Sequence, residues 1–407
     1  MDDGNTIGER LKRARKERGI TQEALAARAG VSVDLVSKLE QNRRTSARVW
    51  SLMALARALD VELSALTDGR DRLAFGEPDI GGGVLAVRDA LLSPSLLPGF
   101  GGLDADDDGT PTPIADLEQT VAAGWDRYWV GDLAGVSALV PGLIADARLT
   151  HRSLGPQAAG PLAQAYELAA SLMAQIGRGD LAAIAAERGI GVAALGDDEL
   201  LWATIHGTYS WVMLRQGRLA EAETVAYDAA RQIQPGFTDP ATRLAAWGLL
   251  LMAAAGARVV AARSGQGSMV GHDAAEYLSM AGAAAERIGR RTPIYGTSFG
   301  AATVRMQTVY THVGSGEPGA ALEEAARVRP GDLRGISHCR HLLDVAQAQV
   351  DMRRPRTAAA RLDEAERRAP AWFAQQTLAR SLVADVRELE TRVSPVTRRL
   401  VRAVGLD

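Results

Sequence analysis

The stretch Q-E-A-L-A-A-R-A-G-V-S-V-D-L-V-S-K-L-E, residues 22–40, decides the fold of the N-terminal part of this chain. Thr21 offers a hydroxyl N-cap to a helix, and Gly30 is the usual residue for the left-handed turn that ends one. Ser32 offers a second N-cap, which predicts another helix through Gln41. The stretch therefore predicts two short helices joined by a tight turn.

The residues on either side of this stretch predict further helices. Ile7, Leu11 and Ala14 form an apolar stripe on a strongly basic segment that ends at Gly19. Apolar positions within 52–59 recur at i, i+3, i+4 and i+7, which is the spacing of one helix face. We therefore expect a bundle of four to five helices.

Residues 22–40 resemble the helix-turn-helix of the Cro and lambda-repressor class, the XRE family. Ala26 is small enough for two helices to cross closely, and Gly30 makes the tight turn between them. Val36 and Leu39 anchor the second helix on the core.

The resemblance covers about residues 6–66 and implies a lambda-repressor-like domain over residues 1–70 that binds double-stranded DNA. It also implies that the second helix of the motif enters the major groove with its N-terminal side chains. The base-reading candidates lie away from the core face of this helix and are Val33, Asp34, Ser37 and Lys38. Lysine can donate to guanine, aspartate can accept from cytosine and valine can touch a thymine methyl group. For Asp34 the alternative is a carboxylate that only stabilises the helix N-terminus.

A second set of polar residues flanks the motif and is expected to hold DNA phosphates rather than to read bases. These residues are Gln22, Arg43, Arg44 and Arg48. Residues 7–50 carry a net charge of +6, whereas the rest of the chain carries −9. The N-terminal end is therefore suited to an anionic partner, although a merely solvated run of charges is the alternative for these residues.

Composition limits the class of protein. The chain has 407 residues, of which 47% are hydrophobic and 23% are charged, and these are ordinary globular values. Cys339 is the single cysteine, so no internal disulfide can form. The acidic N-terminus does not resemble an export signal, and the apolar run Leu244–Ala257 is shorter than the ~20 residues that span a bilayer. We expect a cytoplasmic, nucleoid-associated protein without a membrane partner.

Residues 71–113 are rich in Gly, Pro and Asp and are expected to form a linker. Their net charge of −6 should keep this segment away from DNA. Within it, the pattern of Val84–Leu92 allows a short helix that packs on either neighbouring domain.

Residues 114–407 read as successive Ala-rich helices separated by short turns. The turns lie at Gly131, Gly179, Gly217, Gly316 and Arg353. These units resemble tetratricopeptide (TPR) repeats in an α-solenoid, so the chain as a whole is predicted to be all-α, with a concave surface lined by the first helix of each pair. A generic α-solenoid or an irregular bundle remains the alternative.

The first helices of these units carry aromatic and arginine side chains that are candidates for a ligand site. The candidates are Trp211, Arg215, Arg243, Trp247, Met306 and Tyr310. The same spacing places Arg340, Leu343 and Gln347 on the next unit. Rings beside guanidinium groups suit a peptide or a small amphipathic metabolite. Packing between helices is the alternative role for each of these residues.

Catalysis, metal binding and cofactor binding are not expected. No lysine follows Lys38, so the chain cannot contain a P-loop. His338, Cys339 and His341 are the only Cys/His cluster, and the cysteine side chain lies about 100° around the helix from His338, which leaves two ligands and no zinc site.

The leading hypothesis is a sequence-specific bacterial transcriptional regulator that binds an inverted-repeat operator as a homodimer. Its C-terminal domain is expected to dimerise and to sense a peptide or small-molecule effector. Such architectures resemble actinobacterial regulators of secondary metabolism or development. Two alternatives remain open: a TPR-type interaction scaffold with subsidiary DNA binding, and a ligand-independent repressor of the phage or antitoxin type.

Overall fold

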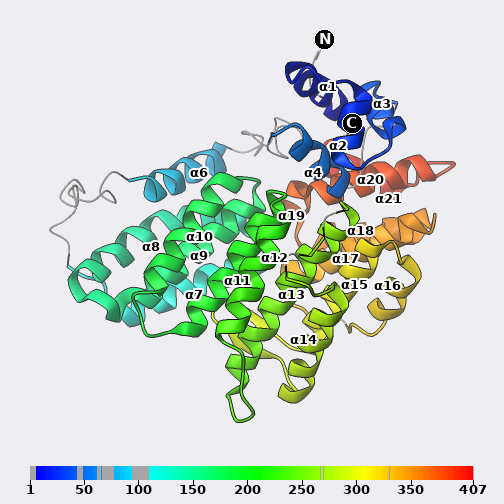
Figure 1. The fold of residues 1–407 in the computed structure, drawn as a ribbon. Coiled ribbons are helices and arrows are strands. Elements are labelled where there is room, and N and C mark those ends of the chain that lie inside the picture. The colour runs from blue at the N-terminus through cyan, green and yellow to red at the C-terminus, as the bar shows by residue number, and fades with distance from the viewer. Residues whose placement is uncertain are drawn as a thin grey trace.

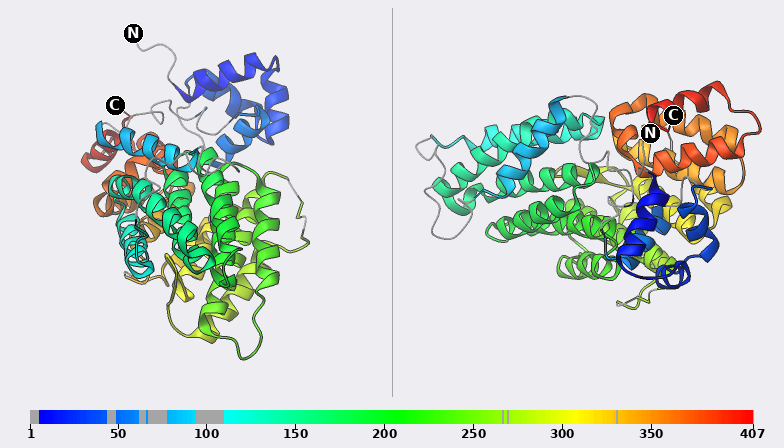
Figure 2. Two further views of the ribbon diagram at one scale, coloured as in Figure 1. Left: turned by 90° about the vertical axis from the view of Figure 1, so that its left-hand side faces the viewer. Right: turned by 90° about the horizontal axis from the view of Figure 1, so that it is seen from above.

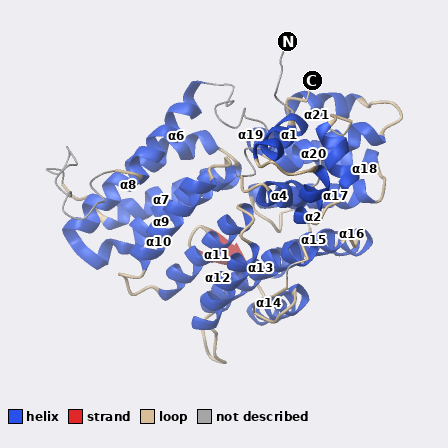
Figure 3. Ribbon diagram, turned by 45° about the horizontal axis from the view of Figure 1, so that its top comes forward, coloured by secondary structure: helices blue, strands red, loops and turns tan. Residues whose placement is uncertain are grey.

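The chain is all-α apart from one small hairpin among the residues that the computed structural model describes (Figures 1 and 3). The described residues are 6–43, 49–61, 66, 78–93, 110–265, 267–268, 270–329 and 331–406. The predicted all-α fold is therefore confirmed.

The N-terminal helices are α1 (Ile7–Glu17), α2 (Gln22–Ala29), α3 (Val33–Glu40) and α4 (Val49–Ala58), followed by α6 (Pro78–Leu91). The middle of the chain forms α7 (Ile114–Val130), α8 (Leu133–Leu154), the 3-10 helix η3 (Gly155–Ala158), α9 (Ala159–Gln175), α10 (Gly179–Ala193), α11 (Glu199–Arg215), α12 (Leu219–Gln232), α13 (Ala241–Arg263) and α14 (Ala274–Ile288). Strands β1 (Thr292–Ile294) and β2 (Thr297–Phe299) precede α15 (Ala301–Ser315), α16 (Pro318–Ala325), α17 (Gly335–Asp351), α18 (Pro355–Arg368), α19 (Pro370–Gln375), α20 (Thr377–Leu389) and α21 (Pro395–Ala403).

Helices α1 to α4 have a hydrophobic core of their own. Its fully buried members include Leu11, Leu25, Val36, Leu39, Leu52, Leu55, Leu59 and Leu66. They include Leu11, Leu52, Leu55 and Leu59, whose helical spacing predicted the bundle, and Val36 and Leu39, which were predicted to anchor the second helix of the motif. The N-terminal helices thus form a distinct small domain.

The rest of the chain is built from antiparallel helix pairs that follow one another, from α7/α8 to α17/α18 (Figure 1). Gly131, Gly217 and Gly316 lie in the turns within three of these pairs and have φ values of 85°, 76° and 79°. Glycine suits these turns because a positive φ brings a side chain too close to the following carbonyl. Arg353 occupies the equivalent place between α17 and α18 with a φ of 56°.

The array of pairs closes on itself, because its last helices contact its first ones (Figure 2). Trp372 Nε1 in α19 donates to Gln175 Oε1 at the end of α9, at 3.1 Å. Arg334, directly before α17, pairs with Asp126 of α7 at 2.9 Å. One hydrophobic cluster consequently joins α6 to α11 with α17 to α21.

A short antiparallel hairpin joins α14 to α15 and was not expected from the sequence. At its turn, Trp129 Nε1 of α7 donates to the carbonyl oxygen of Gly296 at 2.6 Å. A Cβ atom at Gly296 would lie only 2.1 Å from the ring of Trp125, so glycine is required for this close approach. The hairpin thereby adds a second contact that closes the array.

Helix α6 lies within residues 71–113, the segment expected to be a linker. Val84, Val87 and Leu91 are buried in the cluster that also contains α8 residues, and Arg148 of α8 donates to the carbonyl oxygen of Ala90. This helix therefore packs with the C-terminal helices.

Within the part of the chain that the structure describes, two stretches are long and apolar enough, by length and composition, to cross a membrane: Leu133–Gln175 and Ala241–Arg263. In their most apolar windows, 50% and 78% of the residues are buried inside the protein, respectively. That burial is typical of core helices.

The N-terminal domain rests on the C-terminal helices through α4, which contacts α20 (Figure 1). Arg57 Nη1 of α4 also donates to the carbonyl oxygen of Gly217, in the turn between α11 and α12, at 3.2 Å. The two parts of the chain are therefore in direct contact.

Candidate DNA-binding surface and cavity

Local capping fixes the two helices of the motif. The Thr21 hydroxyl accepts from the backbone N–H of Ala24, and the Ser32 hydroxyl accepts from that of Leu35, both at 3.1 Å. Gly30 between them has a φ of 61°. Helix α3 consequently begins at Val33.

The first turns of α3 present exposed side chains. Val33, Asp34 and Lys38 are exposed, and Ser37 is half-buried. Lys38 Nζ lies 2.8 Å from Asp34 Oδ2, and both side chains are more than half exposed. Such an exposed pair is weak, so Lys38 can exchange this partner for a base or a phosphate at little cost.

The phosphate candidates are placed differently from one another. Arg43 is exposed directly after α3, whereas Arg44 and Arg48 lie outside the described residues. Gln22 is half-buried, and its Nε2 donates to Glu40 Oε2 at 2.8 Å. Because a side-chain amide has two N–H donors, this bond leaves one of them for another acceptor.

Glu40 is the centre of a buried polar cluster that the sequence analysis did not identify. Arg15 donates to both of its oxygens, with Nε···Oε1 at 2.6 Å and Nη2···Oε2 at 2.8 Å. The Glu40 side chain is 1% exposed. Burial acts to raise the pKa of Glu40, but the hydrogen bonds from Arg15 and Gln22 outweigh it and hold the pKa below its usual value. The cluster ties α1, α2 and α3 together.

The C-terminal helices line a partly open cavity of about 420 Å³. Its walls come mainly from α11, α13, α15 and α17, the first helices of four pairs, and from the N-terminal end of α20. Four of the six ligand candidates line it, namely Trp211, Arg215, Met306 and Tyr310, and so do Arg340 and Gln347. Leu343 is fully buried in the core instead.

Arg243 and Trp247 do not line this cavity. The α13 residues that do include Leu249, Ala253 and Val260, which follow one stripe of the helix. Trp247 lies two positions before Leu249, about 200° away around the helix, and is partly buried against a core cluster. Arg243 pairs with Glu199 and Asp239 near the start of α13. These two residues lie away from the cavity because the turn positions alone do not fix the helical phase, that is, which face of α13 points toward it.

A charged cluster forms one wall of the cavity. The Arg340 guanidinium lies 5.5 Å from the centroid of the Tyr310 ring, and Arg340 Nε lies 3.3 Å from Asp344 Oδ1. Asp344 is 3% exposed, and burial raises its pKa even though Arg340 opposes this. Burial also raises the pKa of Tyr310. Both groups are thus held in a surrounding of low polarity, where charge interactions are strong.

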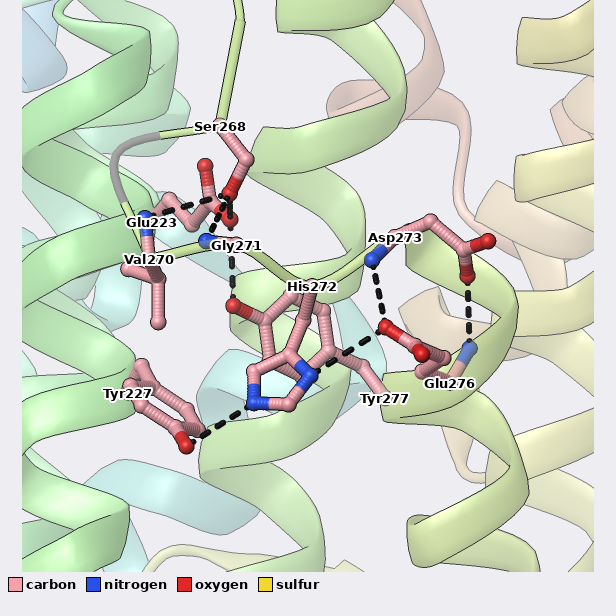
Figure 4. A network of polar contacts seen from close by, with 9 residues as sticks. All are labelled: Glu223, Tyr227, Ser268, Val270, Gly271, His272, Asp273, Glu276 and Tyr277. Carbon is pink, nitrogen blue, oxygen red and sulfur yellow. Dashed lines mark hydrogen bonds and ion pairs between the residues drawn. The ribbon is translucent and has the colours of Figure 1, made fainter.

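A second buried polar network lies beside α12 and was also missed (Figure 4). Glu223 Oε1 accepts from Ser268 Oγ at 2.7 Å and from the Tyr277 hydroxyl at 3.0 Å. His272 contacts the Tyr227 hydroxyl through Nε2. These contacts hold the connection between α13 and α14 against α12. Because they join positions 45 to 54 residues apart, no local pattern could have indicated them.

The comparisons with known proteins concern the N-terminal domain. The helix-turn-helix family matches residues 11–66. The uncharacterized HTH-type transcriptional regulator y4dJ of Sinorhizobium fredii is 40% identical over 76 residues, which are 19% of this chain and 97% of that protein. The HTH-type transcriptional regulators SinR of Bacillus licheniformis and of Bacillus subtilis are each 35% identical over 88 residues, which are 21% of this chain and 78% of theirs.

No solved structure matches this chain significantly. The matched residues include the capped helices α2 and α3 and the exposed side chains at the start of α3. Through its N-terminal domain, the chain belongs to the XRE-type helix-turn-helix family of DNA-binding transcriptional regulators.

Proposed function

We propose that this chain is a sequence-specific regulator that binds an inverted-repeat operator as a homodimer and changes its DNA binding when a peptide or small molecule occupies its C-terminal domain. The observation that carries the proposal is the placement of the N-terminal domain. It contacts the C-terminal helices through α4, while Val33, Asp34 and Lys38 at the start of α3 remain exposed. Because these side chains are exposed, the start of α3 can enter a major groove, which supports base reading by them.

Within this proposal, the four N-terminal α3 side chains Val33, Asp34, Ser37 and Lys38 read bases. Lys38 is the strongest candidate because a guanine edge offers two acceptors to its ammonium group. Gln22, Arg43, Arg44 and Arg48 hold phosphates and fix the register of the domain. Glu40, which accepts a hydrogen bond from Gln22, orients the Gln22 side chain for phosphate binding.

The C-terminal helices act as a TPR-like sensor domain in this proposal. Two of the elements that line the cavity also meet the N-terminal domain. Arg215 lines the cavity two residues before Gly217, whose carbonyl accepts from Arg57 of α4. Leu378 lines it at the start of α20, the helix that contacts α4. A ligand regulates only if it favours one arrangement of these contacts over another.

DNA binding is tested by footprinting the full chain on genomic fragments and by measuring the affinity for the recovered site at several salt concentrations. Arg43→Ala should weaken specific and non-specific binding alike and reduce the log–log salt slope by about 0.9. Lys38→Ala should relax preference at one base pair, at a cost of about 1–3 kcal/mol. Equal selectivity in wild type and Lys38→Ala would remove Lys38 from the reading set, and no protected site at all would favour the interaction scaffold.

Dimerisation is tested by sedimentation of residues 78–407 at micromolar concentration. This fragment keeps α6, which shares the core of the C-terminal helices. A dimer is expected, because one helix-turn-helix reads only a few base pairs and two symmetric copies supply the missing specificity. A monomeric fragment would show that the dimer interface lies elsewhere.

A further inference from the structure

The cavity described above has an apolar body. Leu214, Leu249, Met252, Val260 and Leu378 contribute to its walls. Its volume of about 420 Å³ lies within the range of small-molecule sites, which run from about 300 to 1,000 Å³. The walls therefore suit an apolar group of small-molecule size.

The charged side chains on the cavity wall differ in the contacts that they make with other parts of the protein. Arg263 donates to the carbonyl oxygens of Val313 and Gly314, and Asp351 accepts from Gln347 Nε2. The Arg215 guanidinium lies over the Trp211 ring, 5.6 Å from its centroid.

Arg340 is different. Its side chain is 36% exposed, and only its Nε faces Asp344. Among the described residues, neither of its two Nη atoms nor the Tyr310 hydroxyl makes a hydrogen bond. Tyr310 lies under the guanidinium, and both residues line the cavity. Two nitrogen donors of Arg340 and the hydroxyl of Tyr310 are thus available on the wall of the cavity.

We propose that this cavity binds a small organic anion, with its single anionic group on Arg340 and the Tyr310 hydroxyl and its apolar body against α11 and α13. This deepens the proposed sensing function and rests on it for its biological meaning. A cation is disfavoured because the Arg340 guanidinium carries a positive charge and has only donors. The buried carboxylate of Asp344 holds the guanidinium in place, so little ordering is needed when the anion arrives.

Binding is tested on the full chain with 8-anilinonaphthalene-1-sulfonate, a small aromatic anion that fluoresces in apolar sites. N-phenyl-1-naphthylamine, which has a similar aryl body without the sulfonate, is the neutral control probe. At 150 mM salt, where long-range attraction to exposed charge is screened, the wild type should bind one sulfonate probe per chain. It should prefer that probe over the neutral one by roughly 10- to 100-fold, the range expected for hydrogen bonds to a charged group.

The variants separate the anion site from the apolar walls. Arg340→Gln/Asp344→Asn removes the guanidinium without leaving a buried carboxylate alone, and it should abolish the preference for the sulfonate while the neutral probe still binds. Tyr310→Phe keeps the ring under Arg340 and should weaken the sulfonate probe several-fold. Ala253→Phe fills the cavity and should exclude both probes. Arg356→Gln, at an exposed arginine in α18, is the matched control and should change neither.

Unchanged sulfonate preference in the Arg340→Gln/Asp344→Asn variant, or unchanged binding of both probes in Ala253→Phe, would overturn the inference. These readouts need no DNA, so they are independent of the operator experiments. Probe binding as described, combined with an operator affinity that the probe does not alter, would uphold the site and contradict the proposed regulation through it.

Discussion

Replacing Glu40 by alanine should strongly destabilise the DNA-binding domain. The substitution removes the acceptor of three hydrogen bonds, two from Arg15 and one from Gln22. Arg15 is only 13% exposed, so its guanidinium is left largely buried without a counter-charge. Removing one partner of a buried pair costs about 3–5 kcal/mol.

We expect about 3 kcal/mol, the lower end of that range, because the partial exposure of Arg15 lets its guanidinium reach water after a small movement. For a domain of this size, 1 kcal/mol corresponds to about 4–8 °C in Tm, so the loss should be about 12–24 °C. A small domain has a total stability near the lower end of about 5–15 kcal/mol. The variant should therefore be marginally folded at 37 °C.

The assay is urea and thermal unfolding of residues 1–70, followed by circular dichroism. A fragment of this size is reasonable because helices α1 to α4 have their own core, and the relative y4dJ is matched over 97% of its length by 76 residues. Asp34→Ala is the control. It breaks the exposed pair with Lys38 and should cost less than about 1 kcal/mol.

The pH dependence has a definite sign. The folded pKa of Glu40 lies below the ordinary value of 4.5, so its contribution to stability is present above pH 4.5 and is lost as the pH falls through the folded pKa. Glu40→Ala should remove this loss. A cost below about 1 kcal/mol, or a cost of Arg15→Ala/Glu40→Ala equal to the sum of the two single costs, would refute the coupling.

Two buried groups in the C-terminal helices should give pH dependences of opposite sign. Burial, with His338 and Arg361 nearby, lowers the pKa of His341 to about 4, so the stability of the full chain should fall as the pH drops from about 6.5 to 4, and His341→Leu should flatten this fall in urea titrations at pH 7.5 and 5. An equally steep fall in His341→Leu would assign it to other groups. Burial raises the pKa of Glu167 to about 7, against the hydrogen bond from Thr208, so stability should be lost as the pH rises through 7. Glu167→Gln should therefore gain in Tm over the wild type at pH 8 more than at pH 5, and an equal difference at both pH values would contradict the shift.

The sequence by itself determined the helix-turn-helix, because the signals that specify it act over a few residues. Thr21 and Ser32 cap the backbone three positions ahead, and Gly30 adopts a positive φ in the turn that it occupies. The exposed face of α3 followed from the same local reasoning, since helical phase within one short helix is fixed by Val36 and Leu39. Three of the helix pairs after residue 114 were likewise marked by their turn glycines, Gly131, Gly217 and Gly316.

Only the tertiary structure decided which of those faces meet. Arg15 and Glu40 are 25 residues apart, Trp372 and Gln175 are 197 apart, and neither pair belongs to a local motif. The cavity depends on the phases of α11, α13, α15 and α17 relative to one another, and each phase is set by packing against the neighbouring helices. A shift of one residue along a helix moves a side chain by about 100° around its axis. Turn positions that are right to within a residue or two therefore do not fix which helix face meets the cavity. For this reason Trp211 and Tyr310 line the cavity as expected, whereas Trp247 does not.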